Sequence, residues 1–312
     1  MVIVLLYARY TGMEAKTFKN VILGTRGIVY DTHGNTIYNG GGSSEVDKYP
    51  YDSNIKTEHL EGEYIQLTTR HDLHVYGHLR EDLGRLYWFQ SPEYFNNCKV
   101  LKNHSHIIRS PDSPLSGKQA LTQHLEWFGF PEDRQLEIYP HTNPASAINY
   151  RVDTLHVAPL ATNKPVIQFL KKTWLNGMNL PEEKYKHRRI YLDRPHQSAA
   201  RTVLNREEII SLLESKDFYI FSGGVSFEEQ SHMFRDADII IGPHGAAFFS
   251  CIFCENNPQI IEFMPSTRYT PMYKDQVDDL GNASYRISKY QSDLQHNFYV
   301  PIQDIIDIFD KV

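Results

Sequence analysis

The chain has 312 residues, of which 41% are hydrophobic and 22% are charged. This length is enough for one large or two ordinary domains with cores of their own, and the composition excludes a disordered chain, a collagen and a small disulfide scaffold. Asp and Glu outnumber Lys and Arg by 38 to 32, which gives a net charge of -6. Because binding a polyanion needs an excess of basic residues, we expect no nucleic-acid partner.

The chain has three cysteines, which is an odd number, and their spacing is not that of a disulfide framework. We therefore expect a reducing, cytoplasmic location and no dependence on disulfides. Cys251 and Cys254 form a CxxC pattern inside an apolar run, which favours helix packing over a metal or redox site. The apolar opening at residues 2–7 is too short to span a membrane and has no basic start or cleavage site. We therefore interpret it as a first strand and expect no transmembrane segment.

The first half of the chain is turn-rich at its start and then alternates strands with helices. Residues 29–31 and 36–38 flank Thr32-His33-Gly34-Asn35, which predicts a hairpin. The glycine run that follows lacks the Gly-Lys-Ser/Thr of a phosphate loop, and we interpret it as a flexible loop. Later strands at 64–67, 99–101, 136–139 and 154–157 and helices at 78–89, 117–128 and 164–175 predict a parallel sheet covered by helices.

The second half has a clearer pattern, which starts after a polar linker at residues 176–187. Asn205 is a candidate helix cap, and Ser226 and Glu229 form a capping box. Strands at 189–192, 218–221, 238–242 and 259–263 alternate with helices at 205–215, 226–235 and 246–253. This alternation predicts a Rossmann-like unit.

The turn Pro243-His244-Gly245-Ala246-Ala247 joins an apolar strand to a helix, which is where open α/β sheets bind ligands. Small residues there let the free amides of the helix approach a phosphate, although they also allow tight strand–helix packing. Glu262 ends the next strand, where a carboxylate can accept both hydroxyls of a ribose or remain an exposed charge.

Two arginines, Arg194 and Arg201, follow the strand at 189–192 in a loop of small and polar residues. Guanidinium groups suit a diphosphate leaving group when no metal neutralises it, although each arginine could also be a surface charge. Asp236-Ala237-Asp238 resembles the Asp-x-Asp of metal-dependent sugar transferases, but Asp238 opens a buried strand. We therefore expect no metal site there.

His78 and Asp82 are four residues apart, so a helix would carry them on one face. A carboxylate or imidazole in that position could take a proton from an acceptor hydroxyl. An amphipathic helix with a solvated polar face explains the same residues equally well.

Taken together, these residues resemble glycosyltransferase family 61. Tyr76-Gly77-His78 with Asp82 resembles the family's Asn-x-x-His-x-x-x-Asp segment, although its asparagine is absent. The segments that follow the family's order and spacing are 189–194, 201–205, 226–230, 237–246 and 260–262, with the later Tyr273 and Tyr285.

The resemblance implies an α/β fold of the GT-B type, with two Rossmann-like domains facing a central cleft. Residues 1–178 would bind the acceptor, residues 179–312 would bind the nucleotide sugar, and a last helix at about 301–311 would cross back to the first domain. The implied reaction is an inverting, metal-independent transfer from a UDP-sugar to an oligosaccharide or glycoprotein, with no cofactor. Members of the family commonly use UDP-xylose or UDP-N-acetylglucosamine, so the resemblance favours xylose as the transferred sugar, with N-acetylglucosamine as the alternative.

The resemblance also implies residue roles. Asp82, or His78, would be the base that deprotonates the acceptor hydroxyl. Arg194, Arg201 and the helix amides after His244 would stabilise the departing diphosphate, and Glu262 would hold the ribose. The remaining residues implied at the nucleotide-sugar site are Asn205, Gly245, Ala246 and Tyr273.

Two other functions compete with transfer. The first is a non-catalytic module that binds a nucleotide or glycan on the same fold. The second is a nucleotide-sugar epimerase or dehydrogenase, which is disfavoured because no Gly-x-Gly-x-x-Gly follows a strand.

Overall fold

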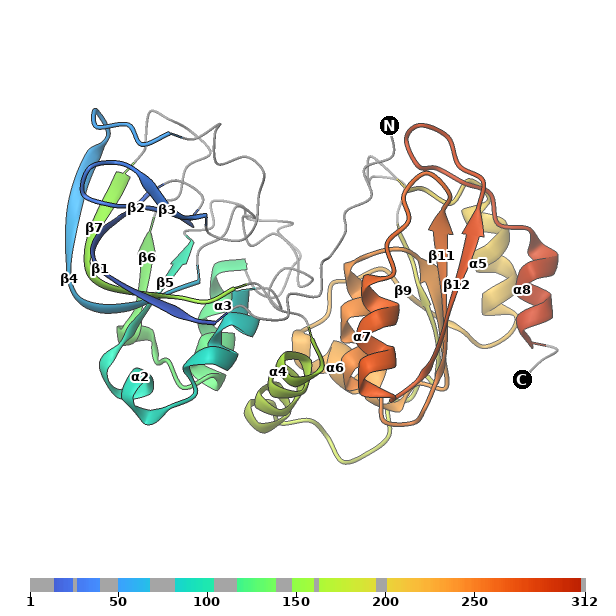
Figure 1. Ribbon diagram of the computed structural model, residues 1–312. Coiled ribbons are helices and arrows are strands. Elements are labelled where there is room, and N and C mark those ends of the chain that lie inside the picture. Colours follow the sequence, from blue (N-terminus) through green and yellow to red (C-terminus); the bar gives the residue numbers. More distant parts are fainter. Residues whose placement is uncertain are drawn as a thin grey trace. The chain divides into compact units, whose positions relative to one another are not determined.

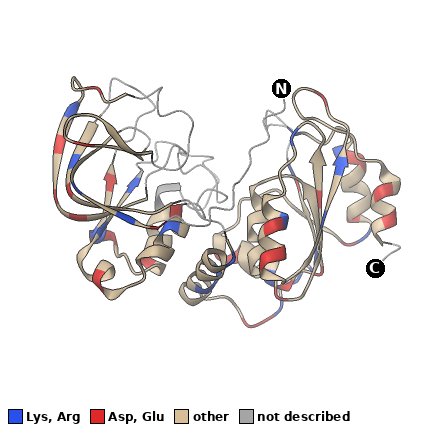
Figure 2. Cartoon of the chain, viewed as in Figure 1, with Lys and Arg blue, Asp and Glu red and all other residues tan. Residues whose placement is uncertain are grey.

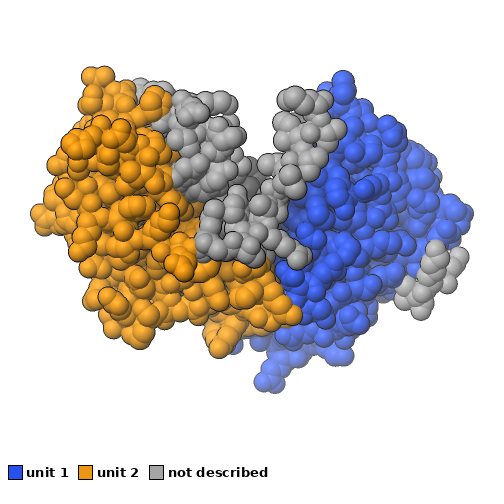
Figure 3. All heavy atoms as spheres, viewed as in Figure 1, with its two compact units in different colours: residues 1–8, 179–312 blue, residues 9–178 orange. Residues whose placement is uncertain are grey.

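The computed structural model describes residues 14–24, 27–39, 50–67, 82–103, 117–138, 148–159, 163–194 and 201–309. They fall into two compact units that divide between Met178 and Asn179 (Figures 1 and 3). We call these the N-terminal and the C-terminal unit. Within the described residues, no helix is both long enough and apolar enough to cross a membrane.

The N-terminal unit is built on a seven-stranded sheet with the order β3-β2-β1-β7-β4-β5-β6. Its strands are β1 (Lys16–Leu23), β2 (Ile28–Tyr30), β3 (Thr36–Asn39), β4 (Lys56–Gln66), β5 (Lys99–Asn103), β6 (Gln135–Ile138) and β7 (Ile148–Val157). Its described helices are η3 (Arg85–Phe89), α2 (Pro92–Asn97), α3 (Gly117–Trp127), η4 (Glu132–Arg134) and α4 (Lys164–Gly177).

This sheet is mixed, and the strands predicted to be parallel are parallel in it. Strands β7, β4, β5 and β6 are parallel, and the order β6-β5-β4-β7 reverses direction between β4 and β7 as in half of a dinucleotide-binding fold. Strands β1, β2 and β3 add an antiparallel meander at the edge of β7. The predicted hairpin is confirmed: Asp31 N–H donates to the Asn35 carbonyl at 2.8 Å, and such a short turn can only join antiparallel strands.

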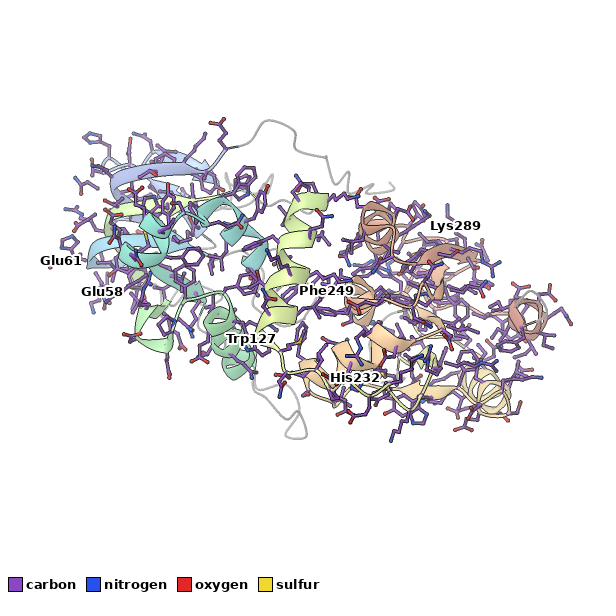
Figure 4. All side chains as sticks on the ribbon, turned by 90° about the horizontal axis from the view of Figure 1, so that it is seen from below. Glu58, Glu61, Trp127, His232, Phe249 and Lys289 are labelled. Atoms are coloured by element: carbon purple, nitrogen blue, oxygen red, sulfur yellow. The ribbon has the colours of Figure 1, made fainter. Side chains whose placement is uncertain are left out.

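The helices α3 and α4 pack through aromatic side chains. The indole N–H of Trp174 donates to His124 Nδ1 at 2.7 Å, and both side chains are buried. Trp127 of α3 lies beside α4 (Figure 4), where a Cβ on Gly177 would come within 2.3 Å of its indole ring. The last residue of α4 is therefore a glycine because the indole occupies the space of a side chain.

The C-terminal unit has a five-stranded sheet with the order β9-β8-β10-β11-β12, and every pairing in it is parallel. The strands are β8 (Arg189–Leu192), β9 (Tyr219–Phe221), β10 (Ile239–Pro243), β11 (Gln259–Pro265) and β12 (Ser284–Tyr290). In chain order this is 2-1-3-4-5, the order of a flavodoxin-like doubly wound sheet. The direction of winding reverses between β8 and β10, and ligands bind at such a point.

Helices cover both faces of this sheet (Figure 1). One face carries α5 (Arg206–Glu214) and α8 (Ile302–Phe309), which bury Ile209, Leu213, Ile305 and Ile308 in one apolar cluster with Ile241, Ile261 and Phe263. The other face carries α6 (Phe227–Asp236), η6 (Ala246–Phe253) and α7 (Met272–Leu280). The outward sides of α5 and α8 carry acidic residues (Figure 2).

The predicted helix after His244 is present and has the 3-10 form. The apolar face of the last helix, α8, is buried on the C-terminal unit, where Phe309 contacts Phe218 with ring centroids 5.6 Å apart. That this helix crosses back to the first domain stays a prediction. The capping box at Ser226 is confirmed in part, since the Ser226 hydroxyl accepts the Glu229 N–H at 3.0 Å.

Candidate functional site

The candidate site lies at the carboxyl edge of the C-terminal sheet, where β8 and β10 flank the point at which the winding reverses. The loops that follow β8, β10 and β11 carry Arg194, His244 and Arg268 respectively. Because the three strands are parallel, these loops leave the sheet at one edge.

The loop after β8 is anchored by a buried ion pair. Arg206 Nε and Nη2 donate to the two carboxylate oxygens of Asp193, each at 2.8 Å, and the Ser222 hydroxyl donates to Asp193 at 3.0 Å. The Asp193 carboxylate is fully buried, and its hydrogen bonds are the main reason that the pKa of Arg206 is raised. This pair fixes the backbone from which Arg194 extends.

Arg194 lies over the turn after β10. A Cβ on Gly245 would stand 3.6 Å from Arg194 Nη1, so the guanidinium contacts the glycine where other residues would carry a side chain. Gly242, at the end of β10, has a different reason to be glycine. A Cβ there would come within 2.5 Å of the Leu192 carbonyl oxygen, so the close approach of β10 to β8 leaves no room for a side chain.

Three arginines share this region. Burial lowers the pKa of Arg194, and the charge of Arg268 lowers it further. Burial also lowers the pKa of Arg201 to about 10, with further contributions from the charges of Arg194 and Arg268. Arg201 has a positive φ of 67°, rare for a residue with a side chain, and its Nε makes no hydrogen bond to any described residue. Three like charges that influence one another have the chemistry to attract an anion.

His244 is held by Glu262. Its Nδ1 lies 2.6 Å from Glu262 Oε1, and both side chains are buried. A carboxylate at Nδ1 orients the imidazole and leaves Nε2 as the nitrogen available to a ligand. Burial, and then the charge of Glu262, raises the pKa of the nearby Tyr285 hydroxyl well above its usual value.

Glu262 lies in the middle of β11 and not at its end. Its side chain has no exposed surface, because β11 places it inside the sheet's helix-covered face and not at the rim. In this structure its contact with His244 holds that imidazole in place. The ribose-binding role of Glu262 stays a prediction.

Tyr273, at the start of α7, completes the cluster. Its ring lies 5.5 Å from the ring of His244 and 6.2 Å from that of Phe248, measured between centroids. It is also close enough to Arg194 and Arg201 to affect the pKa of both. Of the residues predicted to bind the nucleotide sugar, the structure thus brings Arg194, Arg201, His244, Gly245 and Tyr273 together.

Asn205 and Ala246 lie at the starts of the helices α5 and η6. Asn205 Oδ1 accepts the Val300 N–H at 3.1 Å and its Nδ2 donates to the Val300 carbonyl at 2.8 Å, so the amide ties α5 to the segment before α8. Asn205 is the N-cap residue of α5 as predicted, although its side chain makes no capping hydrogen bond. Ala246 is half-buried and begins η6.

The sequence matches the Glycosyltransferase 61 family over residues 76–261, which is more than half of the chain. The chain belongs to glycosyltransferase family 61. No match was found among curated proteins.

The predicted base lies at the start of the family match. Asp82 is buried with 2% of its surface exposed, and it is the first described residue of the helical segment that continues into η3. His78 and Tyr76 lie outside the described residues. A buried carboxylate is a candidate for proton transfer where burial and neighbouring charges shift its pKa. The role of Asp82 as the base stays a prediction.

Sequence reasoning missed Arg268, which lies beyond the matched range of this family 61 member. One signal could have found it. Arg268 follows the parallel strand β11 just as Arg194 follows β8 and His244 follows β10, so all three belong to one loop-bearing edge.

The Asp-x-Asp segment rejected as a metal site has other partners in the structure. Asp236 accepts hydrogen bonds from Arg235 and from the Tyr185 N–H, and Asp238 accepts one from Arg188 at 2.7 Å. Both carboxylates thus bind arginines of their own unit.

Proposed function

We propose that this family 61 protein is an inverting glycosyltransferase of the GT-B type that transfers a sugar from a UDP-sugar to a hydroxyl of a glycan acceptor. The observation that carries the proposal is the gathering of Arg194, Arg201 and Arg268 around His244 at the edge of a doubly wound sheet. A diphosphate has the charge and size that such a cluster binds.

The chemistry follows from where charge develops. When the bond between the anomeric carbon and the diphosphate breaks, negative charge collects on the leaving group. Arg194 and Arg201 are partly desolvated, which strengthens their attraction for that charge. His244, oriented by Glu262, supplies a ring nitrogen toward the same group. In this proposal the arginines do the work that a metal ion does in other transferases.

The acceptor hydroxyl must lose its proton as it attacks the anomeric carbon from the face opposite UDP. We assign this step to Asp82, with His78 as the other candidate base. A single displacement inverts the configuration at that carbon. For the donor we favour UDP-xylose over UDP-N-acetylglucosamine on family resemblance.

A thermal-shift screen of UDP, UDP-xylose and UDP-N-acetylglucosamine tests the proposal, because a ligand that binds only the folded protein raises its melting temperature. We expect UDP to stabilise the protein and Arg194→Ala to remove the effect. Arg286→Ala, an exposed arginine on β12, is the matched control and should keep it.

Release of UDP from the preferred donor, with a glycan acceptor or slowly with water, then separates an enzyme from a binding module. Tight UDP binding with no turnover on any acceptor would favour the non-catalytic module. Absence of UDP binding in the folded protein would contradict both.

A further inference from the structure

Three side chains of unlike chemistry meet in the N-terminal unit, and none of them has a role in the function proposed above. They are Glu63 on β4, Cys98 between α2 and β5, and His156 on β7. One ligand atom from each lies within 4.8 Å of the other two. Glu63 Oε2 is 3.3 Å from His156 Nε2 and 3.9 Å from Cys98 Sγ.

The sheet register explains why residues so far apart in sequence converge. Ile65 pairs with His156, and Glu63, two residues earlier on β4, points to the same face. Tyr64 pairs with Lys99 on the other side of β4, so Cys98 stands beside Glu63 in the same register. The parallel pairing of β4 with β7 and β5 thus places all three side chains together.

The neighbours hold the histidine and the cysteine in place. His156 Nδ1 is 2.9 Å from the Thr17 hydroxyl, and the rings of Tyr94 and Phe89 pack edge-on against the imidazole. The Cys98 N–H donates to the Tyr94 carbonyl at 3.0 Å, and Arg134 Nε donates to the Cys98 carbonyl at 3.0 Å. With Nδ1 bonded to Thr17, the remaining ring nitrogen of His156 faces Glu63.

The cluster is closed on one side and open on the other. Cys98 is fully buried and His156 is 5% exposed, whereas the Glu63 side chain is 47% exposed. An ion can therefore enter past the carboxylate and reach the two buried ligands. A nucleophilic role for Cys98 fits less well, because the thiol is buried and its hydrogen bond is to the carboxylate and not to the imidazole.

We propose that Glu63, Cys98 and His156 bind a Zn²⁺ ion, with water as the fourth ligand. With metal–ligand bonds of about 2.0–2.3 Å, a tetrahedral ion separates nitrogen from oxygen by about 3.3 Å and sulfur from oxygen by about 3.6 Å. The observed separations of 3.3 and 3.9 Å are close to these values. A mixed sulfur, nitrogen and oxygen set is the choice of a borderline-soft ion such as Zn²⁺.

The role of this ion would be structural. It would join β4, β7 and the end of α2, and it would take no part in the sugar transfer proposed above. On binding, the Cys98 thiol gives its proton to solvent and its sulfur bonds to the metal as thiolate. The prediction that the transfer needs no metal is unaffected.

Titration of the chelator-treated full chain with Co²⁺ tests the proposal, because tetrahedral cobalt reports its ligands by absorption. We expect one equivalent to bind with visible bands of tetrahedral Co²⁺ and a near-ultraviolet thiolate charge-transfer band, and Zn²⁺ to displace it. Cys98→Ser should remove the charge-transfer band. Thr17→Val should weaken binding by roughly tenfold, as loss of an outer partner does.

Glu63→Gln keeps the test decisive if Cys98→Ser fails to fold, because the Glu63 side chain is half exposed. It should weaken Co²⁺ binding at least ~100-fold, more than loss of an outer partner. His59→Gln is the matched control, since His59 on β4 binds the Asp153 carboxylate at 2.7 Å with no thiol nearby, and it should bind Co²⁺ as the parent does. No binding by the folded parent, or an unchanged spectrum in the Cys98 and Glu63 variants, overturns the proposal.

Discussion

Glu262 and His244 form the buried pair on which the candidate site rests. Both side chains are inside the unit and are joined by one short hydrogen bond of 2.6 Å. Removing one partner of such a pair leaves a polar group buried without compensation, which costs far more than an exposed ion pair contributes. The stability of the C-terminal unit should therefore depend on Glu262 even without a ligand.

Glu262→Ala should lower the free energy of unfolding by about 3 kcal/mol. Glu262→Gln keeps an acceptor for the imidazole N–H and should cost less than half as much. Urea unfolding followed by circular dichroism measures both. If Glu262 instead held a ribose and had no part in the fold, Glu262→Ala would unfold at the same urea concentration as the parent and lose only UDP affinity.

The arginine cluster predicts opposite effects on stability and on binding. Arg268 is exposed but repels Arg194 and Arg201, so removing its charge reduces the electrostatic repulsion in the unliganded protein. Arg268→Gln should melt at the same temperature or higher without ligand, yet bind UDP about tenfold more weakly, as expected for one charge-assisted hydrogen bond. Thermal melting and calorimetry measure the two effects. A lower melting temperature with unchanged UDP affinity would show that Arg268 is a structural residue.

At the scale of elements, we expect the contact between α3 and α4 to be sensitive to pH. Burial lowers the pKa of His124 to about 3, and the neutral ring accepts the Trp174 N–H at Nδ1. Because the pKa in the unfolded chain is about 6.5, the unfolded state binds the proton more readily. The stabilisation is complete above pH 6.5 and is lost as the pH falls toward 3.

The N-terminal unit should therefore lose about 2 kcal/mol of stability between pH 7.5 and pH 5 through His124 alone. Tryptophan fluorescence during urea unfolding reports this unit, since Trp88, Trp127 and Trp174 all belong to it. His124→Asn keeps an acceptor for the indole and should show a smaller pH dependence. The exposed His59 provides the control, because His59→Gln should behave as the parent does; equal pH slopes in all three proteins would contradict the assignment.

The elements themselves were largely predictable because their signals are local. Strand–helix alternation located β8 to β11, and Ser226 located the start of α6. The form of η6 was not predictable, since an apolar run of eight residues suits an α-helix and a 3-10 helix equally. The place of the antiparallel meander of β1 to β3 in the sheet was not predictable either, because a hairpin signal does not say which sheet edge the hairpin joins.

At the scale of the whole molecule, the proposed function divides the work between the two units. Nucleotide binding is assigned to the C-terminal unit and proton removal to Asp82 in the N-terminal unit. Asp82→Asn should lower turnover roughly a thousandfold, the usual contribution of a general base, while UDP affinity stays within about twofold. Rate measurements and UDP calorimetry on the same preparation test this.

Two controls make the Asp82 result interpretable. Asp133→Asn changes an exposed carboxylate on η4 and should leave turnover unchanged. Because Asp82 is buried, the melting temperature of its variant must be compared with that of the parent. An equal loss of turnover and UDP affinity would remove Asp82 from the role of base.

The sequence alone determined the family, the strand–helix alternation from β8 to β11 and most of the residues that gather at the carboxyl edge of the C-terminal sheet. These depend on short motifs and on a general rule, that loops after parallel strands meet at one edge of the sheet. The tertiary structure decided what depends on contacts between distant residues: that Glu262 is buried against His244, that Arg268 joins Arg194 and Arg201, and that α8 buries its apolar face in one cluster with α5. Glu63, Cys98 and His156 belong to this second group, because only the register of β4 with β5 and β7 brings them together.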